Sequence, residues 1–268
     1  MSLESEIKKR RTFAIISHPD AGKTTLTEKF LLYGGAINLA GSVKGKKTAK
    51  HAVSDWMEIE KERGISVTSS VLQFNYEGYC INILDTPGHA DFGGEVERVL
   101  TMVDGVLLLV DAYEGPMPQT KYVLRKALEQ HLKPIVVINK IDRPEARPEE
   151  VIDEVLELFM DLDASDEQLD CPFVYASAKN GVAALEISDE MKDMKPLFET
   201  ILDYIPAPEG DPEAPTQVLI STIDYNEYVG RIGVGKIDNG TLKINQDVAL
   251  VNHHEPDKME KVKITKLY

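Results

Sequence analysis

The feature that most constrains this chain is the segment Ser-His-Pro-Asp-Ala-Gly-Lys-Thr-Thr at residues 17–25. It follows an apolar run, residues 13–16, and it opens a helical pattern of apolar residues. Such a strand–loop–helix context favours phosphate binding, because the loop N–H groups and the helix N-terminus both attract an anion. Ser17 stands where the general pattern has its first glycine, but its small side chain is compatible with the turn. The segment therefore predicts a nucleotide phosphate site.

The residue types in this loop predict separate roles. Lys23 is expected to reach the β- and γ-phosphates and to act catalytically by neutralising their charge, and the Thr24 hydroxyl is expected to bind Mg²⁺. The predicted nucleotide contacts of the loop are His18, Pro19, Asp20, Ala21, Gly22, Lys23, Thr24 and Thr25.

Short apolar runs alternate with helical patterns over most of the chain. This alternation predicts an α/β fold, a mixed and mostly parallel sheet with helices on both faces. Glu77-Gly78 is a hairpin signal, so one antiparallel strand is expected on the otherwise parallel sheet. The predicted strands are 13–16, 71–76, 79–84, 106–110, 135–138 and 173–176, and the predicted helices are 23–33, 93–102, 119–131, 149–160 and 195–204.

A second domain is predicted after a proline-rich segment, residues 206–215, which contains four prolines and three acidic residues. We expect a nucleotide-binding domain over 1–207, a linker over 208–216 and the start of an all-β barrel over 217–268. The predicted strands there are 218–223, 232–237, 248–251 and 262–267, with a tight turn at Asn239-Gly240. These strands are too few to close a barrel, so the barrel is expected to be truncated.

Charge and cysteine content limit the classes of partner. The formal net charge of −15 opposes non-specific binding to DNA, RNA or a membrane surface. No apolar run is long enough to span a membrane. The two cysteines, Cys80 and Cys171, lie far apart in apolar runs, which is typical of free thiols in a reducing cytoplasm. We therefore expect a cytoplasmic protein with no membrane or DNA partner. We also expect the nucleotide-binding domain to be monomeric.

The segment Asp85-Thr86-Pro87-Gly88-His89 follows a predicted strand about sixty residues after the phosphate loop. An acidic residue at a strand end can support a Mg²⁺ shell through water, which is the role expected of Asp85. Gly88 can bring its backbone N–H close to a γ-phosphate. By itself this segment would be only a turn, but after a phosphate loop it predicts a γ-phosphate sensor.

Two further segments predict which base is bound. In Asn139-Lys140-Ile141-Asp142, the Asp142 carboxylate can accept hydrogen bonds from both N1–H and N2–H₂ of guanine, donors that adenine lacks. Lys140 can cover the base with its methylene groups, and Asn139 is expected to tie this loop to the phosphate loop. After the next strand, the backbone N–H groups of Ser177, Ala178 and Lys179 can donate to guanine O6. The pair of segments predicts GTP or GDP and disfavours an ATP-using enzyme.

Arg63-Gly64-Ile65-Ser66 offers a second hydroxyl for Mg²⁺ at Ser66. The preceding residues 34–62 are rich in lysine, glycine and alanine. That composition is compatible with an ordinary surface loop and also with a switch segment that orders around the γ-phosphate.

In this order, the motifs resemble those of the translational GTPases, the family that includes elongation factors Tu and G. The resemblance implies that His89 orients the attacking water, that large-subunit ribosomal RNA positions His89, and that Asp20 holds a monovalent cation. Ser66 departs from the threonine typical of the family but keeps the hydroxyl.

The resemblance divides between two subfamilies. Residues 1–89 resemble peptide chain release factor 3, and the residues that carry this likeness are 10–20, 54–58 and 64–66. From Ala90 onward the chain resembles the ribosome-associated GTPase BipA, also called TypA, through residues 90–98, 115–120, 162–164, 166–169 and 224–226. A hybrid joined near 85–89 is the simplest hypothesis, and a naturally divergent factor is the alternative. A switch that binds nucleotide with negligible turnover is the alternative to a ribosome-stimulated GTPase.

Overall fold

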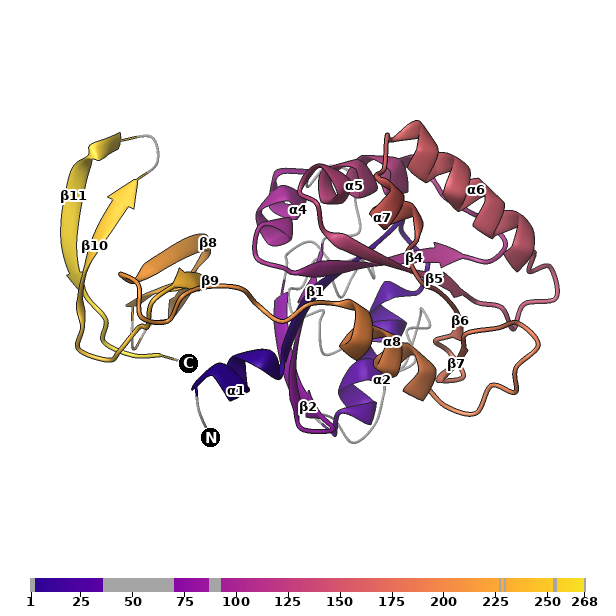
Figure 1. Ribbon diagram of the computed structural model, residues 1–268, viewed down its shortest axis with the longest axis horizontal. Coiled ribbons are helices and arrows are strands. Elements are labelled where there is room, and N and C mark those ends of the chain that lie inside the picture. Colours follow the sequence, from indigo (N-terminus) through magenta and orange to yellow (C-terminus); the bar gives the residue numbers. More distant parts are fainter. Residues whose placement is uncertain are drawn as a thin grey trace. The chain divides into compact units, whose positions relative to one another are not determined.

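The computed structural model describes residues 3–35, 70–86, 93–226, 228, 230–252 and 255–267. Contacts within the chain divide it into two compact units, Met1–Pro208 and Glu209–Tyr268 (Figure 1). The first unit carries the phosphate loop and the 139–142 segment.

The first unit is built on a twisted sheet with the strand order β2–β3–β1–β4–β5–β6–β7. Strands β3, β1, β4, β5 and β6 are mutually parallel, whereas β2 and β7 run antiparallel at the two edges. The strands are β1 Arg10–Ser17, β2 Ser70–Tyr76, β3 Tyr79–Asp85, β4 Gly105–Asp111, β5 Lys133–Asn139, β6 Phe173–Ser177 and β7 Val182–Ala184.

Helices cover both faces of this sheet, as Figure 1 shows, with α4, α5 and α6 on one face and α2 and α8 on the other. Alternate residues of β1 enter opposite cores: Ala14 and Ile16 pack on one side, Phe13 and Ile15 on the other. Burial on both faces explains why the central strands are continuous apolar runs. The helices are α1 Leu3–Lys8, α2 Lys23–Tyr33, α4 Gly93–Leu100, α5 Pro118–Glu129, α6 Pro148–Asp161, α7 Asp166–Leu169 and α8 Lys195–Tyr204.

This architecture confirms the predicted α/β class, with one correction and three elements that were not predicted. The sheet has a second antiparallel strand, β7, which turns back after Gly181 in the left-handed region (φ 72°) and is too short to show a period. Helix α1 buries no residue and so has no apolar stripe to recognise. Helix α7 is a single turn, capped where Ser165 and Gln168 exchange hydrogen bonds of 3.0 and 3.3 Å.

The second unit contains two antiparallel pairs among the described residues, β8 with β9 and β10 with β11. Their bounds are β8 Gln217–Asn226, β9 Gly230–Asn239, β10 Asp247–Asn252 and β11 Glu255–Lys263. The expected last strand, 262–267, was wrong at both ends, because most of β11 is a polar stretch without an apolar alternation.

The tight turn expected at Asn239-Gly240 does not join paired strands, since β9 and β10 belong to different pairs. Gly240 instead has φ 73°, and its N–H donates to the Asp211 carbonyl at 2.8 Å. A Cβ atom there would lie 2.7 Å from the Ala214 carbonyl oxygen, so this glycine serves a close backbone contact.

Several predictions concern residues outside the described part of the chain: Ser66, Pro87, Gly88, His89, most of the 34–62 stretch and the release factor 3-like segments 54–58 and 64–66. Among the described residues, no helix is both long enough and apolar enough to cross a membrane.

Candidate nucleotide-binding site

The phosphate loop lies where β1 ends and α2 begins. Residues 18–22 connect Ser17, the last residue of β1, to Lys23, the first of α2. Asp20 and Gly22 have φ values of 65° and 99°, and a Cβ atom on Gly22 would lie 2.5 Å from Asn139 Nδ2. Glycine is therefore required at residue 22 for both conformation and space. Ser17 has strand geometry, which explains why serine is compatible with its position.

Helix α2 begins with the residues that were assigned to phosphate and metal. Its first intrahelical hydrogen bond runs from Leu26 N to the Gly22 carbonyl at 2.9 Å, so the preceding N–H groups lie at an uncapped helix start. The Lys23 side chain is buried, and Thr24 and Thr25 are half-buried. This arrangement can attract a phosphate through backbone donors, the helix dipole and a lysine.

Asn139 joins three loops. Its Nδ2 donates to the Ala21 carbonyl in the phosphate loop at 2.7 Å, and its Oδ1 accepts from the Ala178 N–H at 2.9 Å. The side chain is 1% exposed, so neither hydrogen bond competes with bulk water. The parallel order β1–β4–β5–β6 makes this contact possible, since the carboxyl ends of these strands meet at one edge of the sheet.

The structure also brings together Asp142 and the 177–179 loop, the two segments that the sequence predicts to bind guanine. Ser177 Oγ donates to Asp142 Oδ1 at 2.7 Å and accepts from the Asn180 N–H at 3.3 Å. Ser177 and Ala178 are buried, whereas Asp142 and Lys179 are exposed. An exposed carboxylate held by a buried hydroxyl can present its acceptors to a ligand with little reorganisation.

Asp111, the last residue of β4, is part of the site although no sequence motif indicated it. It is fully buried, and it forms ion pairs with Lys140 Nζ at 2.6 Å and Arg143 Nη1 at 3.3 Å. Burial by itself would raise the pKa of the Asp111 carboxyl, but hydrogen bonds from Lys140 and from the Tyr113 and Glu114 N–H groups outweigh it and lower that pKa. An acidic residue at the carboxyl end of an apolar strand was the signal that could have identified it.

A second link to the phosphate loop also escaped the sequence analysis. His18 is buried, and its Nε2 lies 3.2 Å from Glu114 Oε2, in the segment after β4. The phosphate loop is thus contacted by Glu114 from the segment after β4 and by Asn139 from the end of β5.

The γ-phosphate side of the site is described only in part. Asp85 ends β3 in register with Ile15 of β1, so its backbone lies beside the strand that leads into the phosphate loop. The buried Thr86 hydroxyl donates to the Ile15 carbonyl at 2.7 Å and fixes this end of β3. The described residues contain no group of three metal-ligating carboxylate, imidazole or thiolate side chains. A Mg²⁺ ion bound through one or two protein oxygens, phosphates and water fits this donor set.

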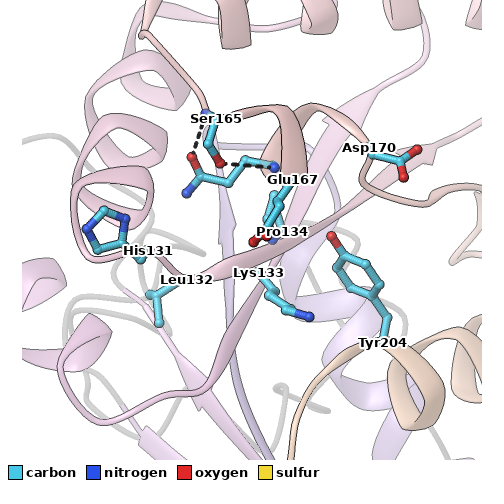
Figure 2. Close-up of a pocket in the computed structure, with 9 residues that line it drawn as sticks. His131, Leu132, Lys133, Pro134, Ser165, Glu167, Asp170 and Tyr204 are labelled. Atoms are coloured by element: carbon cyan, nitrogen blue, oxygen red, sulfur yellow. Dashed lines mark hydrogen bonds between the residues drawn. The ribbon is translucent and has the colours of Figure 1, made fainter.

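A hollow of about 330 Å³ lies at the opposite ends of the strands from the nucleotide loops, beside the amino end of β5 (Figure 2). Lys133, Asp170 and Tyr204 line it, with the Lys133 ammonium 5.3 Å from the centre of the Tyr204 ring. The predicted nucleotide residues lie at the carboxyl ends of the strands, so this hollow is separate from their site.

A parallel sheet with a glycine-containing loop between β1 and α2, and loops from β5 and β6 tied to it, defines a P-loop nucleotide-binding domain. Residues 8–207 match the family described as "Elongation factor Tu GTP binding domain". The chain belongs to this family of GTP-binding proteins.

Relatives with high identity carry the name "Large ribosomal subunit assembly factor BipA". The protein of Haemophilus influenzae is 54% identical over 252 residues, which is 94% of this chain and 40% of the relative. The protein of Bacillus subtilis is 53% identical over 241 residues, 90% of this chain and 38% of the relative. The chain therefore spans about two fifths of the length of these curated relatives. An alignment over 94% of the chain includes most of residues 1–89, so the likeness to BipA is not confined to residues after Ala90.

Solved structures support the same fold. The bacterial selenocysteine-specific elongation factor EF-Sec aligns over 92% of this chain and 37% of its own, with a TM-score of 0.68 and 22% identity. A crystal structure of a Thermus thermophilus protein, ttk003000868, aligns over 94% of this chain and 50% of its own, with a TM-score of 0.65 and 19% identity. At these identities the likeness concerns the fold alone.

Proposed function

We propose that this chain is the GTP-hydrolysing domain of a ribosome-associated factor and converts GTP to GDP and phosphate. The observation that carries the proposal is the position of Asn139, which hydrogen-bonds the phosphate loop and the 177–179 loop together. The domain limits that we infer are 1–207 for the GTP-binding domain, 208–216 for the linker and 217–268 for the start of a β-barrel domain. The family match over 8–207 and the division at residue 208 support these limits.

Guanine selection follows from Asp142 and the loop after β6. The Asp142 carboxylate, oriented by Ser177, accepts from guanine N1–H and N2–H₂, and backbone N–H groups of 177–179 donate to O6. Adenine has an amino group in place of O6 and offers no N1–H, so it would leave these groups unpaired. The methylene groups of Lys140 cover one face of the base.

Hydrolysis relies on positioning and charge compensation. Lys23 and the amino-terminal N–H groups of α2 hold the β- and γ-phosphates. When bound, Mg²⁺ supplies further compensation of the phosphate charge, and Thr24, Ser66 and Asp85 are the residues that we assign to its shell. His89 orients the attacking water, with Gly88 donating to the γ-phosphate. Without a partner, turnover is expected at about 10⁻⁴ to 10⁻² s⁻¹, by analogy with unassisted GTPases.

The partner that we propose is the ribosome, with large-subunit RNA placing His89, and the compartment is the cytoplasm. The support is that the relatives with high identity are named as large ribosomal subunit assembly factors. The release factor 3 likeness of residues 1–89 and the hybrid origin stay hypotheses. An uninterrupted genomic reading frame that encodes both halves would refute an engineered hybrid.

The monovalent cation near Asp20 also stays a hypothesis. The Asp20 carbonyl accepts a hydrogen bond from Lys140 Nζ, and the Asp20 side chain is exposed, so the ligands that we assign to the cation are this side chain and the nucleotide. Equal turnover in potassium and in a bulky organic cation would refute it.

Phosphate release under multiple turnover, with and without ribosomes, tests the function. Ribosome-stimulated release from GTP, with no release from ATP, is the expected result. Tight GTP and GDP binding without release under either condition would instead support a nucleotide-binding switch. No binding of either guanine nucleotide would refute the proposal.

A further inference from the structure

We infer that Asp111 is a positioning residue of the nucleotide site, which holds Lys140 against the phosphate loop and so sets the affinity for guanine nucleotides. This inference rests on the proposed function, because it assumes that the loops at 17–25 and 139–142 bind GTP and GDP. Asp111 itself is buried at the end of β4 and acts through Lys140.

Both oxygens of the Asp111 carboxylate are occupied. Oδ2 accepts from Lys140 Nζ at 2.6 Å and from Arg143 Nη1 at 3.3 Å. Oδ1 accepts from the N–H groups of Tyr113 at 2.8 Å and Glu114 at 3.4 Å. A carboxylate that is 0% exposed and accepts four hydrogen bonds is fixed in one orientation.

The Lys140 ammonium carries this constraint into the phosphate loop, because it also donates to the carbonyl of Asp20. Asp20 and Lys140 have φ values of 65° and 66°, a left-handed conformation that is unfavourable for residues with a side chain and persists where surrounding contacts hold it. The Asp111–Lys140–Asp20 chain of contacts supplies such a constraint on both loops at once.

The turn that carries Asp111 is itself held in place. The Gly115 N–H donates to the Asp111 carbonyl at 3.0 Å, and Arg147 Nε donates to the Tyr113 carbonyl at 3.0 Å. The same turn reaches the phosphate loop a second time through the contact between Glu114 and His18. Asp111 therefore projects from a rigid support and can fix the position of Lys140.

Asp111→Asn tests the inference. The amide keeps the size and one acceptor of the carboxylate, but its NH₂ group must replace an oxygen that accepts either from the two cations or from two backbone N–H groups. We expect the Kd for GDP and for GTP to rise together by about 10- to 100-fold, the range for losing a buried charge-assisted hydrogen bond. The preference for GDP over inosine diphosphate should stay the same, because the contacts of Asp142 to the base are unchanged. Asp161→Asn, which alters an exposed ion pair between α6 and Lys121, is the matched control and should leave the Kd unchanged.

A double-mutant cycle separates positioning from general destabilisation. In a Lys140→Met background, Asp111→Asn should add less than about a twofold loss of GDP affinity. All variants are measured as folded, nucleotide-free chains, with Asp111→Ser as the second variant if Asp111→Asn does not fold. The inference is overturned if a folded Asp111 variant binds GDP like the unsubstituted chain. It is also overturned if Asp111→Asn lowers GDP affinity as much in the Lys140→Met background as it does in the unsubstituted chain. If the unsubstituted chain binds neither nucleotide, the proposed function fails instead.

Discussion

The contacts of Asn139 provide the sharpest test of how the site is assembled. Asn139→Ala removes two buried hydrogen bonds, of 2.7 Å to the Ala21 carbonyl and 2.9 Å from the Ala178 N–H. Each bond is worth about 1 kcal/mol, and each abandoned buried group adds a desolvation cost, so the total is about 2–4 kcal/mol. About 1.4 kcal/mol corresponds to a tenfold change in affinity. If the full free-energy cost destabilises the GDP-bound chain relative to the nucleotide-free chain, GDP affinity should fall by about 30- to 700-fold.

The assay is a titration with a fluorescent GDP analogue, paired with the unfolding midpoint of each nucleotide-free variant. Asn82→Ala is the matched control, because Asn82 in β3 also makes two side-chain hydrogen bonds, to Gln73 at 2.9 Å and to Thr12 at 3.2 Å, but lies outside the nucleotide loops. We expect the control to change GDP affinity by less than about twofold. If Asn139→Ala binds GDP within about threefold of the unsubstituted chain, the idea that Asn139 couples the loops is wrong.

Three further outcomes are expected. Asp142→Asn should shift the preference from guanosine to xanthosine nucleotides, because an amide donor complements xanthine O2; unchanged GTP affinity in a binding titration would contradict the guanine assignment. His89→Ala should leave GTP binding intact and abolish ribosome-stimulated phosphate release, and persistent stimulation would show that another group places the water. Burial raises the pKa of the Cys171 thiol to about 12. The unfolded thiol ionises from about pH 9, so folding stability should fall as pH rises from about 9 toward 12, by about 1.4 kcal/mol at pH 10. The free energy of unfolding is measured with denaturant at about pH 8 and about pH 10. If it falls as much in Cys171→Ala as in the unsubstituted chain, the Cys171 thiol is not the cause.

The local parts of the fold were accessible from the sequence because their signals are short-range. Lys23–Tyr33 and Lys195–Tyr204 were predicted with the bounds that α2 and α8 have. The phosphate-loop motif indicates where α2 begins, and apolar periodicity defines α8. The hairpin of β2 and β3 followed from Glu77-Gly78, both of which have positive φ. Elements without such a signal were missed, among them the three-residue strand β7 and the single-turn helix α7.

The candidate site divides in the same way. The motif residues could be proposed because the residues that act together are consecutive in the sequence, as in 17–25 and 139–142. Asp111 and Glu114 were missed, because their roles arise from contacts with Lys140 and His18, which are 29 and 96 positions away along the chain.

The sequence by itself determined the family, the nucleotide class and the local backbone of the phosphate loop, because short motifs dictate dihedral preferences and donor chemistry directly. Only the tertiary structure decided how these loops meet and which further residues support them. The parallel order β1–β4–β5–β6 brings residues more than a hundred positions apart to one edge of the sheet. Strand order depends on how both faces of the sheet are buried, a non-local balance that consecutive residues do not encode. The phosphate loop and its contact with Asn139 were thus predicted from short motifs, whereas its supports at Asp111 and Glu114 belong to the fold.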